Sequence, residues 1–260
     1  MNNYIIIEKI RSGNFGEVYI GQHKLSNKRV AIKVEPKEYN TLKYETQIYN
    51  YLNNVSHIPK LKGFYTDNNN NFLILDLLEY NLKYYKIHKI HKFQNIENIL
   101  NIIHKLITIL KNIHDMGIIH RDIKPENICF KNNEVYLIDF GLAKKIINNE
   151  KHICERNINS IIGTPNYISI NIVNGIEPSR RDDIESLCYI ILYLYLNDHD
   201  FSEYCNLNNI DKKYINNILN RIDDVNLNKI INDLLIYCRS ISFSTKPNYT
   251  YLLNLLIIHQ

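Results

Sequence analysis

The feature that most constrains this chain is a pair of short polar segments with a strand-like run between them. The first segment is His120-Arg121-Asp122-Ile123-Lys124-Pro125-Glu126-Asn127, and the second is Asp139-Phe140-Gly141. The intervening apolar run, Val135 to Ile138, predicts a short buried strand that delivers Asp139 to a fixed place. Two acids, one amide and one lysine at this spacing supply the groups that phosphoryl transfer to a hydroxyl requires.

Each polar residue of the two segments has a candidate role in that chemistry. Asp122 can orient the acceptor hydroxyl and take its proton, and Lys124 can reach the phosphate that is moved. Asn127 and Asp139 carry the oxygen atoms that would hold Mg²⁺ against the phosphates. The order HRD…N and then DFG is the signature of protein kinases, which the chain therefore resembles.

An amino-terminal pattern of strand, glycine turn and strand adds candidates for nucleotide binding. Gly13 and Gly16 allow the backbone to lie close over a triphosphate, and Phe15 between them would shield the phosphates from water. Arg11 stands where kinases have the first glycine of this loop, which is a departure from the pattern. The candidate nucleotide contacts of the region are Ile10, Gly13, Phe15, Gly16, Val18, Ala31 and Lys33.

Lys33 is the candidate phosphate-binding lysine, because it shares one face of its strand with Ala31. A lone lysine at a strand end is usually a solvated charge. Here the flanking motifs reverse that expectation and favour the functional interpretation. Such a lysine needs a carboxylate to hold it, which either Glu38 or Glu45 could provide. Glu45 is the stronger candidate, since the helical run Tyr39 to Leu52 places it beside an apolar face.

A buried strand, Phe72 to Leu78, leads into a connector that predicts a hinge. By the same resemblance, Leu75 would lie at the back of an adenine pocket, and backbone groups of Asp76 and Leu78 would bond the base. Cys129, on a short strand after the first polar segment, would lie beneath the adenine as a small buried hydrophobe.

Two long helices are predicted around these segments. Apolar residues at helical spacing from Ile96 to Met116, ended by Gly117, predict a core helix that leads into the first polar segment. The apolar run Ile184 to Leu196 is shorter than the roughly 20 residues of a membrane span, so it predicts a buried helix. His88 and His91 have no cysteine or acidic neighbours, and we expect them on an exposed surface rather than at a metal.

Composition narrows the remaining possibilities. With 260 residues and 45% apolar content, the chain can form one two-lobed domain with a sizeable core. The net charge of +4 comes from scattered cations, which predicts a solvated surface and no nucleic-acid binding. Five cysteines without C-x-x-C pairing indicate a reducing compartment, and Met1 to Ile7 lacks a signal-peptide pattern. We therefore expect a monomer without a membrane partner, intracellular and cytoplasmic, with the nucleus as the alternative location.

Further tracts resemble the casein kinase 1 group over nearly the whole chain, and the sister vaccinia-related kinases share parts of one of them. They are Val30 to Glu35, Asp139 to Lys145, Ser169-Ile170-Asn171, Gly175 to Ser186, and Cys238-Arg239-Ser240 with Lys246-Pro247-Asn248-Tyr249. The resemblance implies an α+β, bilobal protein kinase fold in one domain, residues 1–260. An N-lobe of about residues 1–76, a small antiparallel sheet with one main helix, would be joined by a hinge of about 76–80 to a larger, mainly helical C-lobe of about 81–260. ATP and Mg²⁺ would be the cofactors.

The resemblance also implies the acceptor and further site residues. Lys124 lies where Ser/Thr kinases keep a lysine, so protein Ser and Thr hydroxyls would be the acceptors. Thr164 would bond to Asp122 and Lys124, and Asp183 would accept hydrogen bonds from the backbone of the first polar segment. Arg180 would join an anion site that favours acidic or already phosphorylated residues upstream of the target. A structural ion pair within the run of four charged residues that Arg180 begins is an equal alternative.

Departures from the family leave a second function open. Arg11 and Cys188 stand at two expected glycines, which allows a pseudokinase-type scaffold that binds partners without transferring phosphate. Ser160 is the only hydroxyl residue from Ile146 to Ile162. An active enzyme of this kind is therefore expected to be constitutively active, without switching by phosphorylation of this segment.

Overall fold

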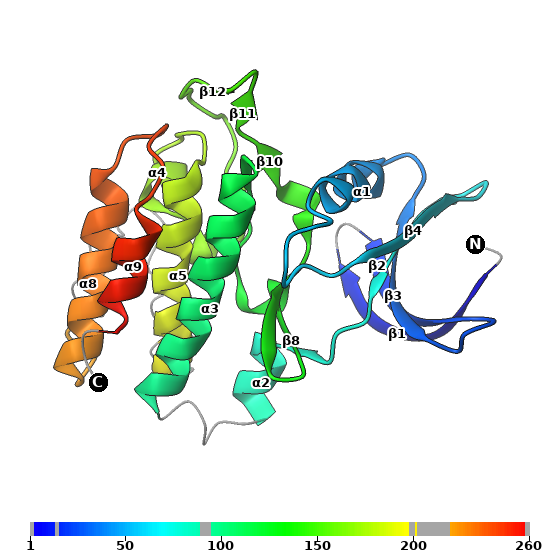
Figure 1. Cartoon of the computed structure of the whole chain (residues 1–260), viewed down its shortest axis with the longest axis horizontal. Coiled ribbons are helices and arrows are strands. Elements are labelled where there is room, and N and C mark those ends of the chain that lie inside the picture. Colours follow the sequence, from blue (N-terminus) through cyan, green and yellow to red (C-terminus); the bar gives the residue numbers. More distant parts are fainter. Residues whose placement is uncertain (1–2, 14–15, 89–94, 198–200, 202–218, 258–260) are drawn as a thin grey trace. The chain divides into compact units, whose positions relative to one another are not determined.

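A computed structural model describes residues 3–13, 16–88, 95–197, 201 and 219–257 (Figure 1). The chain divides into two compact units, Met1–Tyr80 with Cys129–Ala143, and Asn81–Ile128 with Lys144–Gln260. The expected lobes placed every residue after about 81 in one lobe, whereas the structure groups Cys129–Ala143 with the amino-terminal residues. Phe15, His91 and Cys205 lie outside the described residues.

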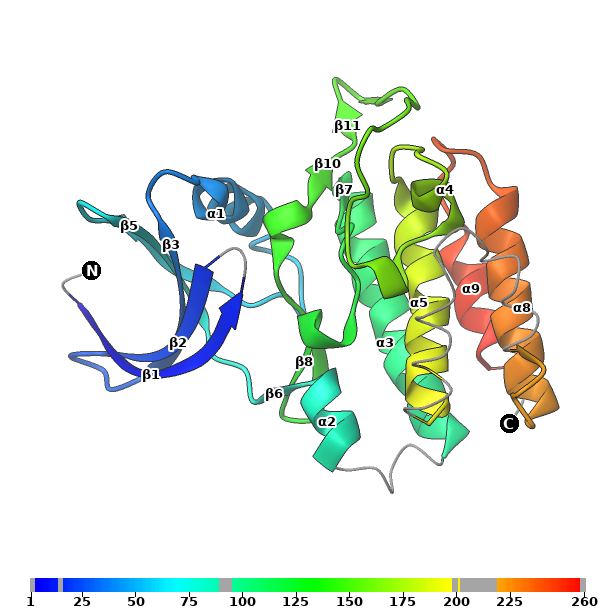
Figure 2. The same ribbon diagram turned by 180° about the vertical axis from the view of Figure 1, so that it is seen from behind.

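The first unit is built on an antiparallel sheet of five strands in the order β1-β2-β3-β5-β4 (Figure 2). The strands are β1 (Tyr4–Gly13), β2 (Gly16–His23), β3 (Arg29–Pro36), β4 (Leu61–Thr66) and β5 (Asn70–Asp76). Ile32 of β3 is paired with Ile74 of β5, and both side chains are fully buried. The β-branched and aromatic residues around this pair form the core of the sheet, as strand propensity favours.

Helix α1 (Thr41–Tyr51) contacts β3, β4 and β5 and is fixed at its start by a side chain from β3. The residue before the helix, Asn40, is in the left-handed conformation and makes no side-chain cap. Instead the buried carboxylate of Glu35 accepts the Leu42 N–H at 2.9 Å and the Thr41 hydroxyl, so it satisfies donors of the first turn. The apolar face of α1 and Glu45 point inward, as the periodicity predicted.

A hairpin formed by β8 (Ile128–Lys131) and β9 (Glu134–Leu137) completes this unit, with β6 (Tyr80–Asn81) beside β8. Asn132 and Asn133 both have positive φ, the requirement of a two-residue type I′ turn. After β9, Phe140 packs edge-on against Tyr49 of α1, with ring centroids 5.3 Å apart. This contact explains why the hairpin and the residues after it belong to the first unit.

The second unit is mainly helical. Its described helices are α2 (Leu82–His88), α3 (Ile96–Asp115), α4 (Ile170–Val173), α5 (Arg180–Tyr195), α8 (Val225–Ser240) and α9 (Tyr249–Leu255). Its short strands are β7 (Ile118–Ile119), β10 (Lys144–Lys145), β11 (Ile147–Asn148) and β12 (Lys151–His152), with β10 paired to β7 and β11 to β12.

Helix α5 forms the centre of the second unit, between α3 and α8 in both views (Figures 1 and 2). Fourteen of its sixteen residues are buried, including the acids Asp182, Asp183 and Glu185, so the helix is enclosed nearly all round. The prediction of a buried helix here is confirmed, although the helix begins at Arg180 rather than Ile184. Helix α3 also matches its predicted range, and Gly117 follows it with φ 72°.

Among the described residues, no helix is long and apolar enough to cross a membrane. The same part of the chain holds no group of three or more metal-ligating side chains of His, Cys, Asp or Glu. Its four cysteines are free thiols, three of them buried and Cys154 exposed.

Candidate active site

The first unit brings together three charged side chains that the sequence places far apart. Lys33 Nζ, on β3, lies 2.7 Å from Glu45 Oε1 on α1 and 2.8 Å from Asp139 Oδ1 after β9. The Glu45 side chain is 2% exposed, whereas that of Asp139 is 37% exposed. A buried carboxylate therefore holds the lysine, and a second one extends toward solvent. Of the two acids considered as partners of Lys33, the structure selects Glu45.

The environment of this cluster keeps Lys33 charged. Burial alone would lower the pKa of Lys33, but the carboxylates of Asp139 and Glu45 raise it above its usual range. Burial raises the pKa of Glu45 to about 7, against the opposing charge of Lys33. The Phe140 N–H donates to Glu45 Oε1 at 3.2 Å, and the Asp139 N–H donates to Tyr49 Oη at 3.2 Å. Two backbone bonds thus fix the Asp139 segment against α1.

Several other nucleotide candidates of this unit lie on the five-stranded sheet, whereas Leu78 follows β5 and Cys129 lies on β8. Ala31 is in register with Leu75 of β5, and Val18 of β2 is in register with Lys33. Leu75 is buried, while Ile10 on β1 is exposed. Burial raises the pKa of the Cys129 thiol to about 12, consistent with a small buried hydrophobe.

Two candidates carry contacts that the sequence did not predict. The Asp76 N–H donates to Lys60 O at 3.1 Å, so a bond from Asp76 to an adenine base would have to use its carbonyl oxygen. Gly16 has φ 121°, and a Cβ there would lie 2.1 Å from Val34 O. Glycine at 16 is therefore required by its own strand geometry, whether or not a nucleotide is bound.

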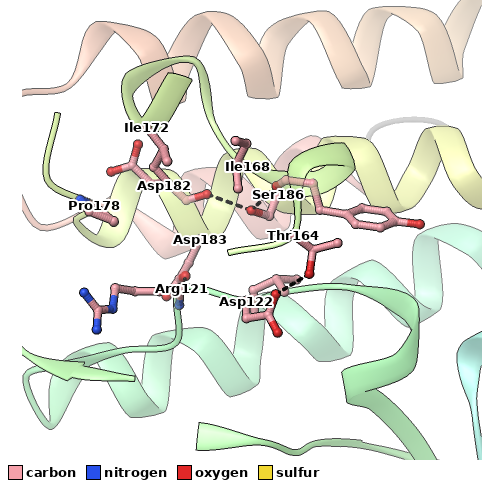
Figure 3. Close-up of a pocket in the computed structure, with 11 residues that line it drawn as sticks. Arg121, Asp122, Thr164, Ile168, Ile172, Pro178, Asp182, Asp183 and Ser186 are labelled. Atoms are coloured by element: carbon pink, nitrogen blue, oxygen red, sulfur yellow. Dashed lines mark hydrogen bonds between the residues drawn. The ribbon is translucent and has the colours of Figure 1, made fainter. Parts of the chain in front are cut away.

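The second unit holds the candidate base in a closed hydrogen-bond cluster. Asp122 Oδ1 accepts the Thr164 hydroxyl at 2.7 Å (Figure 3). Asp122 Oδ2 accepts Asn127 Nδ2 at 2.9 Å and lies 2.6 Å from Lys124 Nζ. Lys124 Nζ also donates to Thr164 Oγ1 at 2.9 Å, so Thr164 contacts both residues as the resemblance implied. Beside Asp122 and Thr164 lies a cavity of about 10 Å³, room for about one water molecule.

Asp183, on α5, holds the backbone that precedes Asp122. Its Oδ2 accepts the His120 N–H at 2.7 Å, and its Oδ1 accepts the Arg121 N–H at 2.8 Å. Arg121 has φ 69°, a left-handed conformation that costs energy in a non-glycine residue and is common at functional sites. The predicted hydrogen bonds of Asp183 to this backbone are therefore present, and they hold a strained residue next to the candidate base.

His114 of α3 completes this support and was not singled out from the sequence. Its Nε2 donates to Asp183 Oδ2 at 2.9 Å, and its Nδ1 is paired with the hydroxyl of Tyr249. Burial lowers the pKa of His114, although Asp183 opposes the shift. The neutral ring therefore donates from Nε2 and accepts from Tyr249. The signal available in the sequence was a histidine near the end of an apolar helical run. Its partner Asp183 lies 69 positions further along the chain, so the sequence alone did not indicate the pair.

Asn127 has the geometry of a metal ligand. Its Nδ2 is bound to the carboxylate and the carbonyl of Asp122, each at 2.9 Å. Its Oδ1 is buried and has no hydrogen-bond partner among the described residues. A buried amide oxygen without a partner is costly unless a ligand fills the role, and Mg²⁺ prefers such oxygens. Asn127 thus fits Mg²⁺. Within the first unit, the partly exposed Asp139 carboxylate is also of a kind that Mg²⁺ prefers.

Arg180 differs from its predicted role. The residue is 6% exposed, and its Nη1 donates to Ser244 O at 3.4 Å. Burial also lowers its pKa. A guanidinium enclosed in this way has almost no surface for a substrate phosphate, so the structure argues against an anion site at Arg180. In the same charged run, the ion pair that the structure contains joins Arg181 Nε to Asp182 Oδ2 at 3.9 Å.

Comparison with known families agrees with this geometry. The family model of the protein kinase domain matches residues 4–253. The chain therefore belongs to the protein kinase family. Its α+β fold, an antiparallel-sheet unit and a mainly helical unit, is the one predicted from the sequence. A protein kinase transfers phosphate from ATP to proteins, which is the chemistry that the polar clusters of both units suit.

Proposed function

We propose that this chain is an active, Mg²⁺- and ATP-dependent protein serine/threonine kinase of the casein kinase 1-like type. The observation that carries the proposal is the Asp122 carboxylate, which Thr164, Lys124 and Asn127 all contact. Every group that phosphoryl transfer requires from the protein is present and oriented by its own hydrogen bonds.

The chain's residues divide the work in a defined way. Asp122 accepts the proton of the substrate hydroxyl, and its carboxylate cannot rotate because both oxygens are hydrogen-bonded. Lys33 binds ATP phosphates as a cation held by Glu45. Asn127 Oδ1 and the Asp139 carboxylate would hold Mg²⁺, which neutralises negative charge on the phosphates when it is bound.

Serine/threonine specificity rests on Lys124 and Thr164. Lys124 Nζ lies 2.6 Å from the base, where it can also neutralise the phosphate that is moved. The casein kinase 1-like assignment is supported by contacts between two of the tracts that carry the resemblance. Ser169 Oγ and Asn171 Nδ2 both donate to Asp182 Oδ1, so these tracts act as one structural group.

A transfer assay tests the proposal directly. The purified protein is incubated with ATP labelled at the γ-phosphate and with degenerate peptides that offer Ser, Thr or Tyr as acceptors. We expect Mg²⁺-dependent labelling of the Ser and Thr peptides that Asp122→Asn and Asp139→Asn abolish. Labelling of Tyr peptides would refute the specificity, and absence of mutant-sensitive transfer would refute the kinase activity in favour of a pseudokinase scaffold. Cys188 is one of the two departures from expected glycines that motivate this alternative. Its side chain is buried within α5, so the helix accommodates the departure, and this weakens the alternative.

Substrate preference is a separate part of the proposal. The family resemblance predicts acidic or already phosphorylated residues upstream of the acceptor. The same library, varied at the upstream positions, measures this preference. Because Arg180 is buried, Arg180→Ala should leave any preference unchanged in protein that remains folded. A loss of preference in that variant would return the anion site to Arg180.

We further propose that the protein acts as an intracellular monomer, in the cytoplasm or alternatively the nucleus, without nucleic-acid or membrane partners. The free thiols of Cys129, Cys154, Cys188 and Cys238 support a reducing compartment. Sedimentation of the purified protein at several concentrations tests the monomer, and fluorescence imaging of the tagged protein in its own cell tests the location.

A further inference from the structure

A second charged cluster of the helical unit, apart from the Asp122 cluster, is centred on Glu177. This glutamate is 1% exposed and lies just before α5. Arg156 Nε lies 2.6 Å from its Oε2, Lys144 Nζ lies 2.8 Å from its Oε1, and Arg121 Nη1 lies 3.7 Å from its Oε1. One buried carboxylate therefore contacts three cations that come from three separate stretches of the chain.

The Glu177 carboxylate is ionised, and its negative charge is balanced by the cations around it. Burial alone would raise the pKa of Glu177, but hydrogen bonds from Lys144 and Arg156 hold it below its ordinary value. A buried charge of this kind is tolerated only when its partners are close and hydrogen-bonded, and removing one partner is strongly destabilising. The cluster is therefore a strong local constraint on the segments that supply its cations.

Backbone bonds link the same segments. The Glu177 N–H donates to Arg156 O at 3.0 Å, and the Ile158 N–H donates to Gly175 O at 2.8 Å. Asn157 forms an antiparallel bridge with Ile176 between these two bonds. The stretch 156–158 is thus fastened to 175–177 by main chain as well as by charge.

The cations of this cluster adjoin both functional segments of the unit. Arg121 precedes the candidate base Asp122, and its strained backbone needs support. Lys144 begins β10, which pairs with β7 just before the first polar segment, His120 to Asn127, which is the catalytic loop. Arg156 lies between the DFG motif (Asp139-Phe140-Gly141) and α4. This part of the chain is the activation segment, which in kinases controls activity.

In kinases this segment is commonly ordered by a phosphoryl group that pairs with arginine side chains. Such a group brings nearly two negative charges and several acceptor oxygens. Here the equivalent pairing is made by a carboxylate of the chain itself. Ser160, the only hydroxyl residue from Ile146 to Ile162, is exposed and absent from the contacts of Glu177 described above.

We propose that Glu177 is a positioning residue that replaces an activating phosphate, holding Arg156 of the activation segment and Arg121 of the catalytic loop in place without modification. The inference rests on the proposed kinase activity and deepens it, because it explains how the enzyme would be constitutively active. It predicts that charge at Glu177, rather than phosphorylation of Ser160, sets the turnover rate.

The test compares four variants of the full chain after phosphatase treatment, and a fifth, Glu177→Gly, serves for chemical rescue. Glu177→Gln keeps the shape and removes the charge, and Arg156→Gln removes the cation on the activation segment, whose side chain is 67% exposed. Glu155→Gln is the matched control. Glu155 is an exposed acid next to Arg156 in the sequence, but it pairs with Arg181 and not with the cations of Glu177. Ser160→Ala removes the hydroxyl.

We expect Glu177→Gln to lower kcat by about 10- to 100-fold, the cost of misplacing catalytic groups by about 1 Å, with the KM for ATP within about twofold. Arg156→Gln should also lower kcat. Because it breaks the same contact from the exposed side, it still tests the inference if Glu177→Gln fails to fold. Glu155→Gln and Ser160→Ala should retain kcat. Adding acetate should partly restore kcat to Glu177→Gly, and acetamide at equal concentration should not, because only the anion pairs with the cations.

Limited trypsin digestion supplies a readout that does not depend on catalysis. Cleavage after Lys151 and Arg156 should accelerate in Glu177→Gln while the thermal midpoint of the rest of the protein is retained. Unchanged kcat in both charge variants, together with unchanged cleavage after Lys151 in both, would overturn the inference, as would a requirement for Ser160. A wild-type protein without transfer activity would refute the proposed function, and the digestion would still decide whether Glu177 orders the segment.

Discussion

Replacement of Asp183 by asparagine tests how the catalytic loop is held. The residue is 2% exposed and accepts three hydrogen bonds, from His120 N at 2.7 Å, His114 Nε2 at 2.9 Å and Arg121 N at 2.8 Å. Asparagine keeps the shape but has one acceptor oxygen and one donor group. At least one of the three donors must therefore face an NH₂ group.

The expected cost follows from this count. If the remaining oxygen keeps His120 and His114, the part-buried Arg121 N–H loses its bond. A hydrogen bond to a charged acceptor contributes about 1.5–3 kcal/mol. We expect the free energy of unfolding to fall by about 1.5–3 kcal/mol, a sizeable part of the roughly 5–15 kcal/mol typical of a folded protein.

Urea unfolding followed by circular dichroism measures this loss, and amide hydrogen exchange at His120 and Arg121 locates it. Asp115→Asn is the control, since Asp115 is an acid at the surface paired with Lys246 and Lys111, and such pairs contribute under about 1 kcal/mol. A loss in Asp183→Asn no larger than in the control, or unchanged exchange at both amides, would refute the reasoning.

Three further predictions concern other parts of the molecule. Lys33→Met should lower kcat/KM for ATP by about 100-fold or more, because a charged phosphate partner is lost, while circular dichroism remains that of the wild type. Gly16→Ala should lower stability by about 1–3 kcal/mol in thermal unfolding, because of its positive φ and the close Val34 carbonyl, whereas Gly141→Ala, whose nearest contact would be 3.4 Å, should cost less. Burial lowers the pKa of His114 below 6.5, so the folded state resists a proton that the unfolded chain accepts. Stability from this group is complete above pH 6.5 and decreases as pH falls, and a series of melting temperatures should show this decrease flattened in His114→Gln.

Local patterns predicted much of the fold and part of the site. The periodicity around Glu45 indicated an inward-facing acid on α1, and the ion pair with Lys33 is present. Helix α3 and the stop at Gly117 followed from apolar spacing and from a glycine that can adopt positive φ. These features depend on residues within a few turns of one another, where physical constraints leave a pattern in the sequence.

Contacts between distant residues left no such pattern. His114 bonds to Asp183 across 69 positions, and no local motif encodes this pair. Glu35 is only 7 positions from Leu42, but a cap supplied by the preceding strand matches none of the usual N-cap patterns. The family resemblance placed Arg180 in an anion site, with a structural ion pair as the equal alternative, and its burial depends on the packing of α5. Glu177 drew no attention from the sequence, since only the fold brings its three cations together.

The discontinuous composition of the first unit has a consequence for dividing the chain. The polypeptide passes from one unit to the other at 80/81, at 128/129 and at 143/144. A fragment that ends at Tyr80 would contain Lys33 and Glu45 but not Asp139, so Glu45 would keep its lysine while the carboxylate that extends toward solvent would be missing. Fragment complementation therefore requires residues 129–143 to be supplied as a separate peptide, and its binding to the fragment 1–80 would depend on the Phe140 ring reaching Tyr49.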